Sequence, residues 1–266
     1  MKRFLVASAL SAIAISASAG LTYKVQSTTT GVRSMTLAGT VNVDGPRMRF
    51  DVASGDGTLF KDNSLVLSSD GGRTMSIFDP ATHNYYDVHL EQLLNSSSSM
   101  LNSLGGLVKV EFKNPHVEVR DGGDGGPIEG FPTHKYVLDA SYDMAIEAMG
   151  QKMMMHSAMT TENWTTDQLS NEFGSFIQAR GLRTGIDAVD RLIDAQATAT
   201  RGFPLKQVST VHLNQAGGDM TITTTSSVSN IQSRAIEPAQ FTAPSGYTKV
   251  DDPITKMMRQ MTAPAQ

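Results

Sequence analysis

The chain has 266 residues with no cysteine, 22 lysines and arginines, 26 aspartates and glutamates, and only 6% aromatic residues. The acidic surplus argues against binding to the phosphate backbone of nucleic acids, and the lack of cysteine excludes disulfides and a cysteine-linked lipid anchor. No segment beyond the N-terminus is apolar over the ~20 residues that a membrane-spanning helix requires.

Residues 1–19 have the pattern of a cleavable secretory signal peptide. Lys2 and Arg3 give a positive start, ~12 mostly apolar residues follow, and Ala17 and Ala19 occupy the positions that a signal peptidase reads. An uncleaved N-terminal anchor is the alternative interpretation. We expect a periplasmic protein, although secretion out of the cell would require the same kind of signal.

Removing 19 of the 266 residues would leave 247, and removing Lys2 and Arg3 from the 22 basic residues would leave 20 against 26 acidic ones, a net charge of −6. This length suits one large β-rich domain, which we place at residues 20–250, followed by a flexible C-terminal tail at 251–266. A chain this long buries enough apolar surface to fold without disulfides. We expect no part of the cleaved chain to span a membrane.

Apolar and polar residues alternate through much of residues 20–120, which is the pattern of half-buried β-strands. Turns are expected at Asp44-Gly45-Pro46 and Asp70-Gly71-Gly72, where glycine tolerates a positive φ. The alternating apolar positions include Leu21, Tyr23, Val25, Met35, Leu37, Val41, Val43, Met48, Phe50, Val52, Met75, Ile77, Val108, Val110, Phe112, Val117 and Val119.

An acidic, glycine-rich run occupies residues 121–126, with the sequence Asp-Gly-Gly-Asp-Gly-Gly. A calcium site is one interpretation, but Ca²⁺ takes six to eight oxygen ligands and this run supplies two carboxylates. The composition favours a flexible hairpin loop instead.

A long hairpin is predicted from His134 to Trp164, with its turn at 149–151, because apolar residues again alternate along both arms. Two further strands are expected around 205–213 and 220–231. The total is about eleven strands in hairpin order, so the sequence predicts an antiparallel sheet.

Two stretches break the alternation. Leucines within 90–104 fit an interrupted helical face, and residues 167–200 predict two helices with the apolar stripes Leu169, Phe173, Phe176, Ile177 and Leu182, Ile186, Val189, Ile193. Helices of about a dozen residues are marginal alone, so these are expected to lay their stripes on the sheet. Their glycines and their polar opposite face favour a movable lid, and a permanently docked helical hairpin is the alternative.

The common catalytic motifs are missing from the sequence. It contains no cysteine nucleophile, no G-x-S-x-G elbow, no phosphate-binding loop, no dinucleotide fingerprint and no H-E-x-x-H zinc motif. Six histidines are scattered without the spacing of metal ligands. We therefore expect a protein that is not an enzyme and that carries no cofactor.

Methionines gather in the second arm of the long hairpin, at 153–155, with Met144, Met149 and Met159 nearby. Neighbouring residues of a strand point to opposite faces, so Met153 and Met155 share one face while Met154 and His156 share the other. Three interpretations remain open. The methionines pack an ordinary core, line an adaptable hydrophobic cavity, or bind Cu(I) through thioethers.

Short segments spread over most of the mature chain carry a resemblance. In chain order they are Gly45–Phe50, Arg73–Pro80, Tyr85-Tyr86, Gly130–Tyr136, Glu162-Asn163-Trp164, Gly202–Leu205 and Phe241–Tyr247. Together they resemble a family of exported bacterial proteins of unknown function within the LolA-like superfamily of periplasmic lipoprotein carriers. The resemblance implies a mainly β fold with helices: an incomplete antiparallel β-barrel, open on one side and closed by lid helices.

In the carriers of that superfamily the concave face binds acyl chains, which suggests a non-catalytic protein that holds a lipid or another hydrophobic ligand. The alternative is a structural or sensing module that binds an envelope protein partner. The candidate ligand-binding residues are Met48, Phe50, Tyr142, Met144, Met153 and Met155 on strands, and Phe173, Ile177, Val189 and Ile193 on the lid.

Overall fold

The computed structural model of the protein describes residues 20–31, 33–55, 59–91, 108–148, 151–169, 187–199, 201–215 and 218–253. The strands are β1 Gly20–Thr30, β2 Met35–Asp44, β3 Arg47–Ser54, β4 Leu65–Ser68, β5 Thr74–Asp79, β6 Asn84–His89, β7 Val108–Ile128, β8 Phe131–Ala148, β9 Gln151–Thr166, β10 Phe203–Gln215, β11 Gly218–Arg234 and β12 Thr248–Lys249. The helices are α3 Asp187–Ala199 and the short 3-10 helix η1 Pro238–Phe241.

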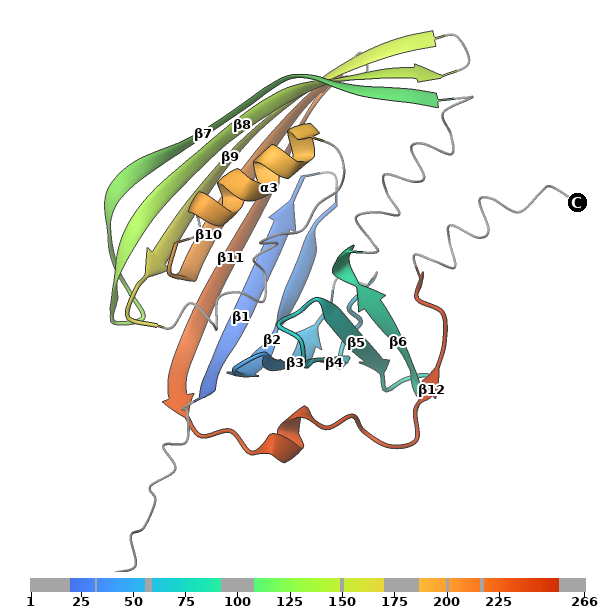
Figure 1. Cartoon of the computed structure of the whole chain (residues 1–266), viewed down its shortest axis with the longest axis vertical. Coiled ribbons are helices and arrows are strands. Elements are labelled where there is room, and N and C mark those ends of the chain that lie inside the picture. Colours follow the sequence, from blue (N-terminus) through green and yellow to red (C-terminus); the bar gives the residue numbers. More distant parts are fainter. Residues whose placement is uncertain are drawn as a thin grey trace, which may run out of the picture.

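All twelve strands form one open sheet, in the order β12-β6-β5-β4-β3-β2-β1-β11-β10-β9-β8-β7. Figure 1 shows this sheet curling around α3 without its two edges meeting. Every neighbouring pair is antiparallel except β12 with β6. The expected fold class, a mainly β half-barrel, is therefore confirmed.

The sheet consists of two groups of antiparallel strands in chain order, the meanders β1–β6 and β7–β11, and the second has α3 inserted between β9 and β10. They are joined side by side where β1 pairs with β11, with Gly20 opposite Arg234 and Thr30 opposite Thr223. The expected turn between β2 and β3 is present, and Gly45 there has a φ of 56°. The long hairpin is present as β8 and β9, although its turn residues 149 and 150 lie outside the described residues.

The prediction of a flexible loop at 121–126 is wrong. These residues lie inside β7, the longest strand, and pair with β8 from Asp121 opposite Tyr136 to Gly126 opposite Thr133. Each half of the run forms a bulge in which an aspartate Oδ1 accepts a hydrogen bond from the backbone N–H two residues later, at 2.7 Å for Asp121 and 2.8 Å for Asp124. The glycines that suggested a loop supply the positive φ that a bulge requires.

The outer face of the β3–β6 region is crossed by the C-terminal segment 235–250. Arg49 donates to the carbonyl oxygen of Gln240 at 3.1 Å, and Arg47 stacks over the Phe241 ring at 4.9 Å. The segment ends as β12, where the Thr248 N–H donates to the His83 carbonyl oxygen at 2.9 Å. The segment therefore covers the edge strand β6, which would otherwise offer unpaired backbone groups.

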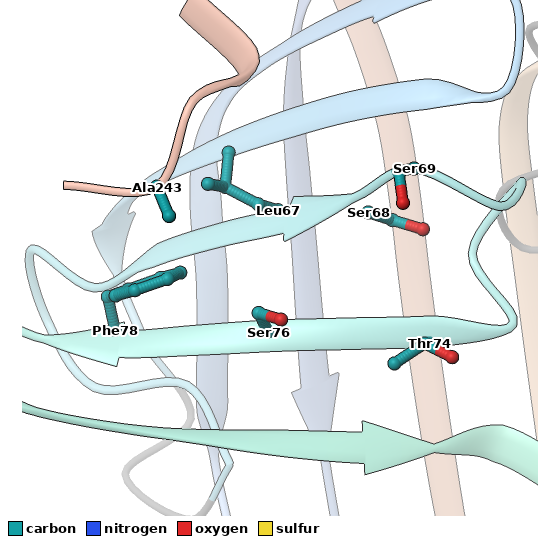
Figure 2. Close-up of a pocket in the computed structure, with 7 residues that line it drawn as sticks. All are labelled: Leu67, Ser68, Ser69, Thr74, Ser76, Phe78 and Ala243. Carbon is teal, nitrogen blue, oxygen red and sulfur yellow. The ribbon is translucent and has the colours of Figure 1, made fainter. Parts of the chain in front are cut away.

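A small hollow of about 140 Å³ lies between this segment and β4–β5 (Figure 2). Its lining consists of Leu67, Ser68, Ser69, Thr74, Ser76, Phe78 and Ala243. Pockets that bury a drug-sized molecule hold roughly 300–1,000 Å³, so this hollow is too small for such a ligand.

The helix α3 lies against β7 and β8. Leu192 and Ile193 are only half-buried, and Arg191 and Asp194 face water. The first predicted lid helix lies outside the described part of the chain except for Leu169, and so do Leu182 and Ile186 of the second and most of the predicted 90–104 segment. Over the residues that the structure describes, none of the helices is both long and apolar enough to cross a bilayer.

Candidate functional site

A continuous row of apolar side chains crosses the inner face of β1–β6. Strand register places them directly opposite one another, in the order Tyr23, Val41, Phe50, Val66, Ile77 and Tyr86. None of the six is more than 7% exposed. Five interstrand spacings give the row a length of about 24 Å, which is on the scale of an extended long acyl chain.

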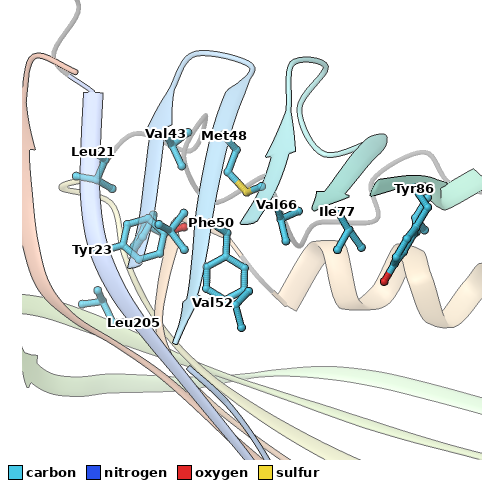
Figure 3. Close-up of a cluster of buried hydrophobic side chains, with 13 residues drawn as sticks. Leu21, Tyr23, Val43, Met48, Phe50, Val52, Val66, Ile77, Tyr86 and Leu205 are labelled. Atoms are coloured by element: carbon cyan, nitrogen blue, oxygen red, sulfur yellow. The ribbon is translucent and has the colours of Figure 1, made fainter. Parts of the chain in front are cut away.

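Neighbouring apolar residues on the same strands widen this row into the largest cluster of the described core. Leu21, Val43 and Met48 lie on one side of it, and Val52 and Val88 also belong to the cluster. Figure 3 shows these side chains projecting from the strands to the same side of the sheet, where the α3 ribbon runs. Residues outside the sheet, Leu59, Phe60 and Leu169, pack on the cluster from that side.

Residues of β10 extend the cluster into the second meander. Phe203 meets Tyr23 edge-to-face with ring centroids 5.4 Å apart, and Leu205 is fully buried beside them. Burial raises the pKa of the Tyr23 hydroxyl above its usual value. The Gly202-Phe203-Pro204 turn thus places an apolar anchor at the junction of the two meanders.

Beside the apolar cluster, a strip of polar side chains enters the inner face of β9, β10, β11 and β1. Hydroxyl pairs join these strands, with oxygen–oxygen distances of 3.0 Å between Thr161 and Ser209 and 2.9 Å between Ser226 and Ser27. These hydroxyls satisfy one another, as buried polar groups must. The inner face therefore has an apolar part on β1–β6 and a polar strip next to it.

Asn163 is the exception within this strip. Its side chain is 0% exposed, and its Oδ1 accepts a hydrogen bond from Gln207 Nε2 at 2.7 Å. Its Nδ2 is buried and has no hydrogen-bond partner within the described portion of the protein. A buried amide N–H left without an acceptor costs ~1–3 kcal/mol, which makes Asn163 the most conspicuous polar group of the inner face.

The candidate strand residues fall into two separate places. Met48 and Phe50 lie in the buried cluster, at 1% and 6% exposure. Tyr142, Met144, Met153 and Met155 share the same face but lie toward the tip of the β8–β9 hairpin, where Met144 is opposite Met155 and Ile146 is opposite Met153. The sheet does not bring the two groups together.

The hairpin tip is also the part of the described chain where large apolar side chains are most exposed. Met153 is 46% and Met154 is 54% exposed, on opposite faces of β9. Met154 shares its face with His156, whose Nδ1 lies 2.7 Å from Asp143 Oδ1. Hydrogen bonds from His156 and Asn114 hold the pKa of Asp143 below its usual value. Within the described ranges, no group of three histidine, aspartate or glutamate side chains is placed to hold a metal ion.

The candidate lid residues are only partly placed. Phe173 and Ile177 lie outside the described residues, and the side chain of Val189 does as well. Ile193 is half-buried on α3. Leu169, the first residue of the predicted stripe, packs on the apolar cluster.

Sequence reasoning missed Asn163 and Gln207 as site residues. The alternation along β9 places Asn163 on the same face as Thr161, but it does not indicate that the amide is buried or that one of its atoms is unpaired. Only the register of β9 with β10, which sets Asn163 opposite Gln207, reveals this.

No family model matches the sequence, and no curated protein matches it. Among solved structures the chain is similar to the LolA superfamily protein NE2245 from Nitrosomonas europaea, with 9% sequence identity and a TM-score of 0.31 over 85% of this chain and 91% of that one. At this level of similarity the comparison carries no argument about individual residues or ligands.

Proposed function

We propose that this protein is a non-catalytic periplasmic carrier whose half-barrel holds a lipid or another elongated hydrophobic ligand. The row from Tyr23 to Tyr86 is the observation that supports the proposal most directly, because it runs without a polar interruption across six strands of an open sheet. An apolar ligand on this face would gain roughly 25 cal/mol for each Å² that it removes from water. The resemblance to the LolA-like superfamily agrees with this role.

A ligand can reach the row only if the side chains that pack on it from outside the sheet move away. Leu169 packs on the cluster, and the described side chains of α3, which comes later in the chain, are at most half-buried. The segment 167–200 is therefore the proposed lid, which would close over the inner face of the empty protein and rest on the ligand in the loaded protein.

The full chain, purified from the periplasm of an expressing bacterium, is expected to carry lipid. Organic extraction should release it, and native mass spectrometry should show a bound mass. After delipidation the protein should take up a fluorescent fatty acid. A protein with no co-purifying lipid and no uptake would contradict the proposed function.

A matched pair of variants locates the site. Val66→Thr places a hydroxyl in the floor of the row, where Val66 is 0% exposed, and should weaken fatty-acid uptake about tenfold, because an unpaired buried hydroxyl costs ~1–3 kcal/mol. Val208→Thr makes the same change on the outer face, opposite Thr225, and should leave uptake unchanged. Equal effects of both variants would count against binding on the inner face.

Hydrogen exchange is expected to show the lid. The amides of α3 should exchange faster than those of β8 and β9 in the delipidated protein, because α3 has no fully buried described side chain while β8 contains the fully buried Leu138. Added fatty acid should slow exchange in α3 and leave the hairpin unchanged. Exchange in α3 as slow as in the hairpin, with and without lipid, would show a fixed helix.

A second candidate function is binding to an envelope protein partner, and the exposed Met153 and Met154 favour it. Methionine suits adaptable protein contacts because its side chain is flexible and polarisable. A photo-cross-linker at position 153 distinguishes the two candidate functions. A repeatable adduct with one protein, formed by the lipid-free chain, supports partner binding. A lipid-loaded chain that forms no protein adduct supports the carrier.

A further inference from the structure

We propose that Asn163 is the polar anchor of the ligand site, and that its Nδ2–H donates a hydrogen bond to the neutral carbonyl oxygen of an acyl ester or amide. This inference rests on the proposed function, since it concerns one end of the same ligand. It identifies the ligand class as an acyl compound whose carbonyl is buried, in contrast to a plain hydrocarbon or a free fatty acid.

The orientation of the Asn163 amide follows from its partner. Because Oδ1 accepts from Gln207 Nε2 at 2.7 Å on β10, the Nδ2 group is turned away from Gln207. The neighbour on its other side is Tyr136 of β8, which register places opposite Asn163. The free donor therefore has a fixed direction on the inner face.

The position of Asn163 fits the junction between a tail and a headgroup. Leu205 lies two residues before Gln207 on β10 and is a fully buried member of the apolar cluster. In the opposite direction exposure rises, because Tyr136 is half-buried and Asp121, opposite Tyr136 on the edge strand β7, is exposed. A tail on the cluster would place its first polar group at Asn163 and the rest of its headgroup toward β7.

The surrounding charges favour a neutral carbonyl over a carboxylate. The lysines nearest in register, Lys135 and Lys206, stack on Trp164 at 4.8 and 4.7 Å, and Trp164 follows Asn163 directly on β9 and so points to the outer face. On the inner face the carboxylate of Asp121 lies 2.6 Å from His134. Burying an anionic ligand group beside a neutral amide, with a carboxylate at the exit, would cost more than burying an ester.

The test compares three probes of matched length on the delipidated full chain: heptadecane, methyl palmitate and palmitate. Methyl palmitate should displace a fluorescent lipid about tenfold more effectively than either of the others, as expected when a buried donor gains its acceptor. Methyl palmitate labelled with ¹³C at the carbonyl should show its infrared C=O band shifted to lower frequency in the complex, which is the signature of a hydrogen-bonded carbonyl.

Two variants complete the experiment. Asn163→Leu, close in volume, should abolish the advantage of the ester and the infrared shift while leaving heptadecane binding intact. Thr161→Val, two residues away on the same face and also buried, should preserve both. The wild-type probe series and infrared band remain decisive if a variant fails to fold.

The outcomes separate this inference from the proposed function. If the wild type binds all three probes equally, or palmitate best, or shows an unshifted carbonyl band, Asn163 is not the anchor although the carrier role stands. If no probe binds, the proposed function itself is overturned.

Discussion

Met48→Ala is expected to lower the free energy of unfolding by about 2–5 kcal/mol, which is the usual cost of truncating a large buried side chain to alanine. Met48 is 1% exposed in the apolar cluster, where it pairs with Val43 on β2 and Ser68 on β4. Its loss leaves a cavity that strands on both sides cannot fill without leaving their hydrogen-bonded register. Urea unfolding followed by circular dichroism measures the change.

Met153→Ala is the matched control, because the same atoms are removed from a side chain that is 46% exposed. Surface substitutions generally change stability by about 0.5 kcal/mol or less. Similar losses at positions 48 and 153 would mean that the apolar cluster on β1–β6 does not hold the sheet together.

Gly39→Ala is expected to cost about 3 kcal/mol or more, because it overfills a packed interface. A Cβ at this position would lie 2.2 Å from the backbone oxygen of Asp51 and 2.6 Å from a ring carbon of Phe50. Gly39 is opposite Val52, next to a bulge in the β2–β3 pairing. The missing side chain is what allows the Phe50 ring to lie across β2 in the middle of the apolar row.

Gly45→Ala tests this interpretation, since Gly45 has open space around it and a φ of 56°. Its cost comes from the left-handed backbone alone and should be near ~1 kcal/mol. Thermal unfolding of the two variants separates a steric clash from a loss of backbone freedom. A cost at Gly39 no greater than at Gly45 would show that the Phe50 ring and β3 can move aside easily.

The alternation of apolar and polar residues predicted most of the sheet, because a strand with one buried face requires this pattern. It placed Met48 and Phe50 on the inner face, and it separated Met153 and Met155 from Met154 and His156, as β9 does. The turns around Gly45 and Gly71 were also predicted correctly, because a positive φ there selects glycine.

The remaining features depend on contacts that local patterns do not encode. Residues 121–126 have the composition of a loop, but their backbone pairs with β8 over a bulged strand, and composition does not distinguish a bulge from a turn. The separation of the methionine hairpin from Met48 and the unpaired amide of Asn163 both follow from which strands lie side by side. The alternation along a strand assigns each residue to one face of the sheet, but it does not show which other strand lies beside it.

The seam between β1 and β11 has a consequence for how the chain acquires its structure. Each meander contains pairings that are short in sequence and can form as the chain emerges, but the seam joins Gly20 to Arg234, so one of the first strands made waits for one of the last. Pairings this distant close slowly, because the whole intervening chain loses its freedom at that step. The pairings inside each meander join residues that are much closer in sequence, so they are expected to form before the seam. The complete sheet therefore forms only once the chain is available from residue 20 to residue 234.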